Sequence, residues 1–171
     1  MKKSADISSC GRYRFSLTRQ WDDDKPNLVF LMLNPSTADS EQDDPTIRRC
    51  IGFAEREDRG GIIVVNLYPL RTPSPRVLFE QVGSIEERAW TKNVMKIAAV
   101  GPGSIVCAWG SNGSQKFMHE CVLLGTRSLL READLKCLGT DKNGNPRHPL
   151  YLKKDAKLIE WRPVINMRSY Y

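Results

Sequence analysis

The chain has 171 residues and a formal net charge of +6, with 40% hydrophobic and 27% charged residues. This length favours one domain with a substantial core, and no apolar run approaches the roughly 20 residues of a bilayer span. The five cysteines are scattered without a C-x-x-C pair, and no apolar stretch follows the basic residues at the start of the chain. We therefore expect a single soluble domain, 1–171, without a secretory signal, in the reducing cytoplasm.

Basic residues gather in the carboxyl-terminal third of the chain. The segment 142–157 contains Lys142, Arg147, Lys153, Lys154 and Lys157 against the single acidic residue Asp155. Such a stretch would suit contacts with the phosphates of a nucleic acid. A merely solvated basic surface is the alternative.

The first half of the chain predicts a strand, two core strands and a helix. Alternation over 11–21 is typical of a half-buried antiparallel strand at a sheet edge. The short apolar runs 28–33 and 61–65 predict buried parallel strands. Between them, Asp44 and Pro45 are suited to the N-cap and first position of a helix that reaches about Arg59.

The second half repeats this alternation of helices and strands. Short helical pieces and a helix over 85–100 precede a third core strand at 104–108. A helix over 114–131 leads to a short fourth strand at 135–138, and the turn-rich segment 139–149 predicts a surface loop. We expect a three-layer α/β/α sandwich around a central, mostly parallel sheet of four or five strands.

Polar residues come directly after the predicted strands or in the loops that leave them. In open α/β sheets, ligands bind outside the carboxyl ends of the strands. Asn34, Asn66, Asn112 and His148 should therefore surround one site, although they are far apart in sequence.

Each of these residues has a structural alternative to a functional role. Asn34, Pro35 and Ser36 could hold a water or a ligand, or Asn34 could only close an Asx turn. Asn66 could read an amide-like edge or cap its strand. Trp109 could form an aromatic wall or ordinary packing. His148 lies between two prolines beside Arg147, in a loop rather than on an apolar face.

Five motifs in order resemble the bacterial and phage family catalogued as domain of unknown function 1643 (DUF1643). The resemblance covers roughly residues 11–155 and implies little about activity. The motifs occupy 32–39, 43–54, 65–71, 108–110 and 146–151.

The order of motifs is also similar, more distantly, to the uracil-DNA glycosylase superfamily. There, a strand ends in a water-activating G-x-N-P-G-like motif, a later strand ends in a base-reading Asn, and a loop carries H-P-S-P. Residues 33–36, Asn66 and 148–150 would correspond to these. The glycines beside the first motif are missing, and Leu150 and Tyr151 replace Ser-Pro.

This second resemblance implies a uracil-DNA-glycosylase-like fold and recognition of a nucleobase in DNA or a nucleotide, with N-glycosidic bond hydrolysis as the favoured reaction. It needs no metal or organic cofactor. Asn34 would position the water, Asn66 would pair with the base, and His148 would stabilise the leaving base. The other expected contacts are stacking by Tyr68 or Trp109 and phosphate binding by Arg147, Lys153 and Lys154.

Two other classes of function remain open. One is a non-catalytic module that binds a nucleic acid or nucleotide with the same fold. The other is an enzyme acting on a small metabolite, assisted by a metal held by Asp39, Asp43 and Asp44, although their spacing matches no established metal loop.

Overall fold

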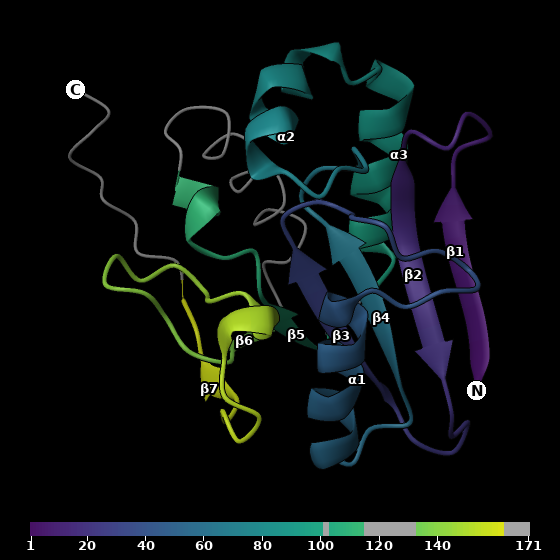
Figure 1. Cartoon of the computed structure of the whole chain (residues 1–171). Coiled ribbons are helices and arrows are strands. Elements are labelled where there is room, and N and C mark those ends of the chain that lie inside the picture. The colour runs from purple at the N-terminus through teal and green to yellow at the C-terminus, as the bar shows by residue number, and fades with distance from the viewer. Residues whose placement is uncertain (101–102, 115–132, 163–171) are drawn as a thin grey trace.

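The computed structural model describes residues 1–100, 103–114 and 133–162. Their strands form one seven-stranded sheet (Figure 1). Its order in space is β1-β2-β4-β3-β5-β6-β7. The strands are β1 (Lys2–Ile7), β2 (Arg14–Gln20), β3 (Asn27–Met32), β4 (Gly61–Asn66), β5 (Ser104–Cys107), β6 (Asp134–Cys137) and β7 (Ile159–Glu160).

The four predicted core strands are confirmed as the central parallel part of the sheet. β4, β3, β5 and β6 run in the same direction, whereas β1, β2 and β7 pair antiparallel at the two sides. The prediction of four or five strands was wrong because β1 and β7 were missed. β1 has few apolar residues, since an exposed edge strand is held mainly through its backbone.

β2 was expected to be a half-buried edge strand, but it lies inside the sheet between β1 and β4. Both of its faces are covered. Phe15 and Leu17 are buried, as expected, but so are Arg14 and Arg19, which are 2% and 0% exposed. Alternation therefore identified the strand, but it did not predict that Arg14 of the expected polar face, and Arg19 two residues after Leu17, would be buried.

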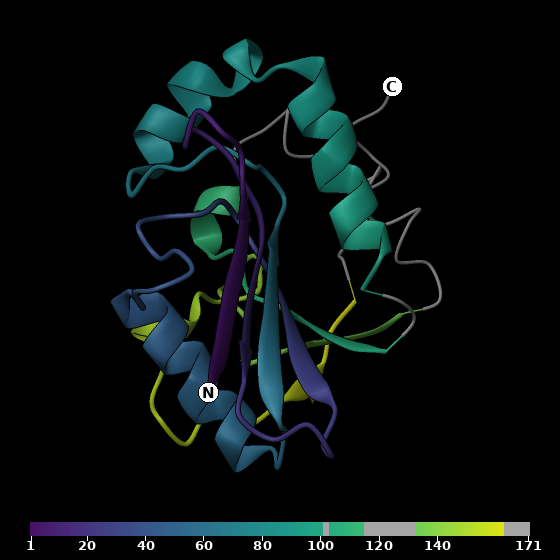
Figure 2. The same cartoon turned by 90° about the vertical axis from the view of Figure 1, so that its right-hand side faces the viewer.

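Helices cover the two faces of the sheet (Figure 2). α1 (Pro45–Arg56) contributes Ile47 and Phe53 to one core cluster, together with residues of β3 and β4. α2 (Pro75–Gln81) and α3 (Glu87–Ala98) contribute Leu78 and Ile97 to the other. No helix of the described ranges is long and apolar enough to cross a membrane.

Local signals placed the helices well. The Asp44 side chain accepts a hydrogen bond from the backbone N–H of Ile47 at 2.9 Å, and Pro45 is the first helical residue, so the predicted start of α1 is confirmed. The segment 139–149 is a loop, as predicted, and runs into the short 3-10 helix η3 (Pro149–Tyr151). The helix predicted over 114–131 falls almost wholly outside the described residues.

Candidate functional site

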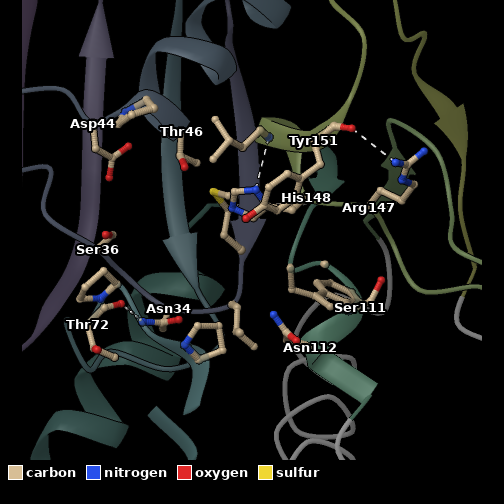
Figure 3. A pocket seen from close by; sticks show the side chains of 18 of the residues that line it. Asn34, Ser36, Asp44, Thr46, Thr72, Ser111, Asn112, Arg147, His148 and Tyr151 are labelled. Atoms are coloured by element: carbon tan, nitrogen blue, oxygen red, sulfur yellow. Dashed lines mark hydrogen bonds between the residues drawn. The ribbon is translucent and has the colours of Figure 1, made fainter. Parts of the chain in front are cut away.

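A pocket of about 450 Å³ opens at the carboxyl edge of the parallel strands (Figure 3). Its walls come from the ends of β3 and β5, the start of α1, the segment before α2, and η3. The polar residues among its lining are Asn34, Ser36, Thr37, Asp44, Thr46, Thr72, Ser111, Asn112, Arg147, His148 and Tyr151.

The pocket brings together six of the residues expected from the sequence: Asn34, Ser36, Trp109, Asn112, Arg147 and His148. Five others do not line it, namely Pro35, Asn66, Tyr68, Lys153 and Lys154. Lys153 and Lys154 are exposed on the segment after η3. The six residues thus come from three separate loops that meet at the same edge of the sheet: the loops after β3 and β5 and the loop before η3.

Asn34 is held in one orientation by the loop that follows β4. Its Nδ2 atom donates to the carbonyl of Thr72 at 2.8 Å, to that of Pro35 at 3.0 Å and to that of Leu70 at 3.3 Å. Oδ1 is therefore turned away from these carbonyls and toward the interior of the pocket (Figure 3). The turn-closing and ligand-facing roles weighed for this residue coexist, because the two ends of one amide perform them.

His148 presents a hydrogen-bond donor to the same pocket. Its Nδ1 accepts from the backbone N–H of Leu150 at 3.3 Å, which caps η3. With Nδ1 as acceptor, the hydrogen of the neutral ring resides on Nε2. Burial lowers the pKa of His148 below its usual value, against the opposing attraction of Asp44. The ring is therefore neutral at pH 7.

The glycine before Ser111 allows His148 to approach β5 closely. Gly110 has a φ of +79°, a conformation that L side chains rarely adopt, and a Cβ built there would lie 3.2 Å from the Cβ of His148. The backbone N–H of Gly110 donates to the carbonyl of Pro146 at 2.9 Å. This junction fixes the distance between the β5 wall and the histidine loop.

Asn66 lies at the expected edge of the sheet but behind the pocket. It is in register with Met32 on the parallel neighbour β3, so the two side chains share a face. Met32 lines the pocket, whereas Asn66 is 1% exposed and neither atom of its amide has a hydrogen-bond partner among the described residues. In this structure Asn66 is a buried neighbour of the pocket wall rather than a part of the wall.

The two aromatic candidates have different surroundings. Tyr68 is fully buried and packs edge-on against Phe79 and Trp90, at centroid distances of 6.1 and 5.6 Å. Its ring therefore belongs to the core under α2 and α3. Trp109 lines the pocket, but it is 3% exposed and packs edge-on against Trp161 at 5.1 Å in the same core cluster, so most of its ring is ordinary core packing.

Three arginines hold the carbonyl groups of the loop between β3 and α1. Arg71 donates to Thr37 at 3.4 Å, Arg14 to Ala38 at 2.8 Å, and Arg19 to Asp39 at 2.6 Å. Burial lowers the pKa of Arg14 to about 10, against the attraction of Asp44, so the guanidinium stays charged at pH 7. The loop that lines one side of the pocket is thus held in place by hydrogen bonds from three arginine side chains to its carbonyl groups.

The three carboxylates considered for a metal each have another partner. Asp39 accepts from the backbone N–H groups of Glu41 and Gln42, and Asp44 caps α1. Asp43 pairs with Arg19 at 2.7 Å and with Lys3 at 3.4 Å. Among the residues that the structure describes, no group of three or more His, Cys, Asp and Glu could hold a metal ion.

Sequence reasoning missed several polar residues of the pocket. Thr46 and Thr72 reach it from the start of α1 and from the loop after β4, and the Asp-Pro and Thr-Pro pairs that mark these turns were the available signal. Ser111 also lines the pocket and bonds to Asp141. Although burial opposes its ionisation, hydrogen bonds from Asn145 and Ser111 lower the pKa of Asp141 to about 2.

The polar pocket lies at the carboxyl ends of the parallel strands, which is the place where open α/β sheets commonly bind ligands. The family model described as "Protein of unknown function (DUF1643)" matches residues 14–150, and the chain belongs to this family. No curated protein and no solved structure matches the chain significantly.

Proposed function

We propose that the pocket binds a nucleobase, in DNA or in a nucleotide, and that the protein hydrolyses its N-glycosidic bond. The observation that carries this proposal is the pairing of an oriented acceptor, Oδ1 of Asn34, with a neutral donor, Nε2–H of His148, in one pocket. The proposed fold relationship is to uracil-DNA glycosylases. It is supported by Asn34, Asn66 and His148 all lying at the carboxyl edge of the sheet.

In the proposed reaction, Oδ1 of Asn34 accepts a hydrogen bond from a water and directs its oxygen at the anomeric carbon. That oxygen bonds to the carbon while the C–N bond breaks and its electron pair leaves with the base. His148 donates a hydrogen bond to the base as negative charge develops on it. The water gives up one proton to solvent, and the released base takes one up.

The polar contacts proposed for the base differ from those implied by the resemblance. Asn66 is buried beside Met32 and does not line the pocket, so we assign the hydrogen bonds to the base edge to other groups that line the pocket. Thr46 offers a hydroxyl and Asn112 offers an amide with both a donor and acceptors. Trp109 supplies the apolar wall against which a base could rest.

The test is release of a free base from single- and double-stranded oligonucleotides and from nucleotides, followed by chromatography. His148→Asn is the most informative variant, because the shorter side chain can still cap η3 through its oxygen, but its amide nitrogen ends short of the position of Nε2. We expect it to fold normally and to lose turnover by about 100-fold or more. Wild-type turnover in His148→Asn would refute the role of the histidine.

A non-catalytic module remains the alternative if the wild-type protein binds nucleotides without releasing a base. The metal-assisted alternative has less support from the structure. Asp39, Asp43 and Asp44 are each committed to a cap, a turn or an ion pair, and Asp44 alone of the three lines the pocket.

A further inference from the structure

The loop that enters the pocket after β3 carries three consecutive backbone N–H groups with no acceptor in the part of the chain that the structure describes. Ser36, Thr37 and Ala38 donate to no group of the described residues through their backbone nitrogens. Ala38 is 1% exposed, and a buried N–H in a folded protein is almost always paired. Ser36 and Thr37 line the pocket.

The hydrogen bonds of the neighbouring carbonyls set the direction of these donors. In a trans peptide the N–H points opposite to the carbonyl of the preceding residue. The carbonyl of Pro35 accepts from the N–H of Thr72, and that of Thr37 accepts from Arg71. The N–H groups of Ser36 and Ala38 are therefore directed away from the attachments that hold the loop.

The positive charge of the arginines that contact the loop favours the binding of an anion by the loop. Arg14, Arg19 and Arg71 all contact its carbonyls. Two nearby carboxylates are turned elsewhere, because Asp43 pairs with Arg19 and Asp39 accepts from its own turn. The carboxylate of Asp44 lines the pocket and opposes this preference, although one of its oxygens caps α1.

We propose that the backbone N–H groups of Ser36 and Thr37, next to the buried N–H of Ala38, bind a phosphate group of the ligand at this corner of the pocket. Successive backbone donors form anion-binding concavities in proteins, and the hydroxyl groups of Ser36, Thr37 and Thr72 add further donors around it. The inference rests on the proposed function in taking the ligand to be a nucleotide, with its base against Trp109.

The direct test follows the backbone amide resonances of the full-length ¹⁵N-labelled protein during three titrations, with inorganic phosphate, thymidine and thymidine 5′-monophosphate. The amides of Ser36, Thr37 and Ala38 should shift saturably with phosphate and with the monophosphate. The monophosphate should bind about tenfold tighter than the nucleoside, since hydrogen bonds to charged groups are strong. Unshifted amides, or equal affinities, would overturn the phosphate site.

A pair of variants separates the loop from general electrostatics. Arg71→Gln removes a charge and the contact with Thr37, and should weaken monophosphate binding about threefold to tenfold while leaving thymidine binding unchanged. Arg71→Lys, which keeps the charge, should lose less. Arg88→Gln removes one positive charge from α3, where the side chain is 86% exposed and pairs with Glu86. Equal effects of Arg71→Gln and Arg88→Gln would contradict the proposal.

The outcomes also distinguish this site from the proposed function. Saturable phosphate binding at the three amides without any binding of thymidine would retain the anion site and reject nucleobase recognition. Base release from an oligonucleotide with no phosphate-induced shift of these amides would retain the proposed function and reject the anion site.

Discussion

Gly110 and His148 approach so closely that one added methyl group would meet the histidine: a Cβ on Gly110 would lie 3.2 Å from the Cβ of His148. The positive φ of Gly110 adds backbone strain to any substitution there. Gly110→Ala should therefore displace η3 and cost about 1–2 kcal/mol of unfolding free energy. Ligand affinity and turnover should fall together.

Gly52 is the matched control for this substitution. It lies in α1 with nothing within 4 Å of the position where its Cβ would be. Gly52→Ala should stabilise the protein by about 0.5–1 kcal/mol in denaturant unfolding, because alanine favours the helix more than glycine does. Loss of ligand binding in Gly52→Ala but not in Gly110→Ala would contradict the role of the close approach between Gly110 and His148.

Asn34→Asp tests the orientation of the Asn34 amide. The carboxylate would face the carbonyls of Pro35, Leu70 and Thr72, which now accept from Nδ2. We expect a loss of about 2–3 kcal/mol of unfolding free energy, exceeding the loss in Asn34→Ala. Urea unfolding of both variants at pH 7 decides the point, and an Asp variant more stable than the Ala variant would mean that the amide is turned the other way.

The ion pair of Arg19 with Asp43 should be important for stability. Arg19 is fully buried, and besides Asp43 it also bonds to the carbonyls of Asp39 and Thr18. Arg19→Met should cost about 3 kcal/mol or more, because it leaves the partners of a buried cation unpaired. Asp43→Asn, which keeps an oxygen acceptor for the guanidinium, should cost less in the same thermal unfolding experiment.

The pH dependence of stability should carry the signature of His148. Its folded pKa lies below the unfolded value near 6.5 because of burial, so below about pH 6.5 the unfolded state binds the proton more readily. The titration of His148 therefore has no effect on the unfolding free energy above about pH 6.5, and it lowers the unfolding free energy as the pH falls toward 5. The difference in unfolding free energy between the wild type and His148→Asn should narrow or reverse on acidification. A constant difference would contradict the shift.

The basic segment after the pocket predicts a salt-dependent contact with DNA. Arg147, Lys153 and Lys154 are exposed, and replacing all three by Ala should weaken DNA binding and flatten its dependence on salt concentration. The melting temperature should barely change, since exposed charges contribute little. The measurement is fluorescence anisotropy at several salt concentrations, and affinity unchanged by the triple substitution would remove this surface from the DNA contact.

The sequence predicted the core strands and the edge where polar residues meet, because apolar runs and turn residues are local signals. It did not predict which of two polar residues at that edge would reach the pocket. Asn34 follows the end of β3 by two residues and enters the loop, whereas Asn66 is the last residue of β4 and stays beside Met32 in the sheet. The two strands have six residues each, so these environments are separated by a difference of two positions relative to the end of the strand.

Local sequence patterns also could not predict that Arg14 and Arg19 would be buried. Alternation along β2 predicted a solvated face for Arg14, and an arginine two residues after Leu17 gave no local reason to expect a buried charge at position 19. The acceptors that make burial possible belong to the loop before α1, Ala38 for Arg14 and Asp39 and Asp43 for Arg19, and all lie 20 or more residues away. Only the folded arrangement supplies those partners.

The attachment of Lys3 to this same loop connects the pocket to the outermost strand. Lys3 of β1 donates to the carbonyl of Glu41 at 3.0 Å and lies 3.4 Å from Asp43. Edge strands open locally at a lower free-energy cost than the centre of a sheet. Fraying of β1 would release one support of the loop while the parallel strands stay intact, so the amides of β1 and of residues 39–43 should exchange their hydrogens at related rates.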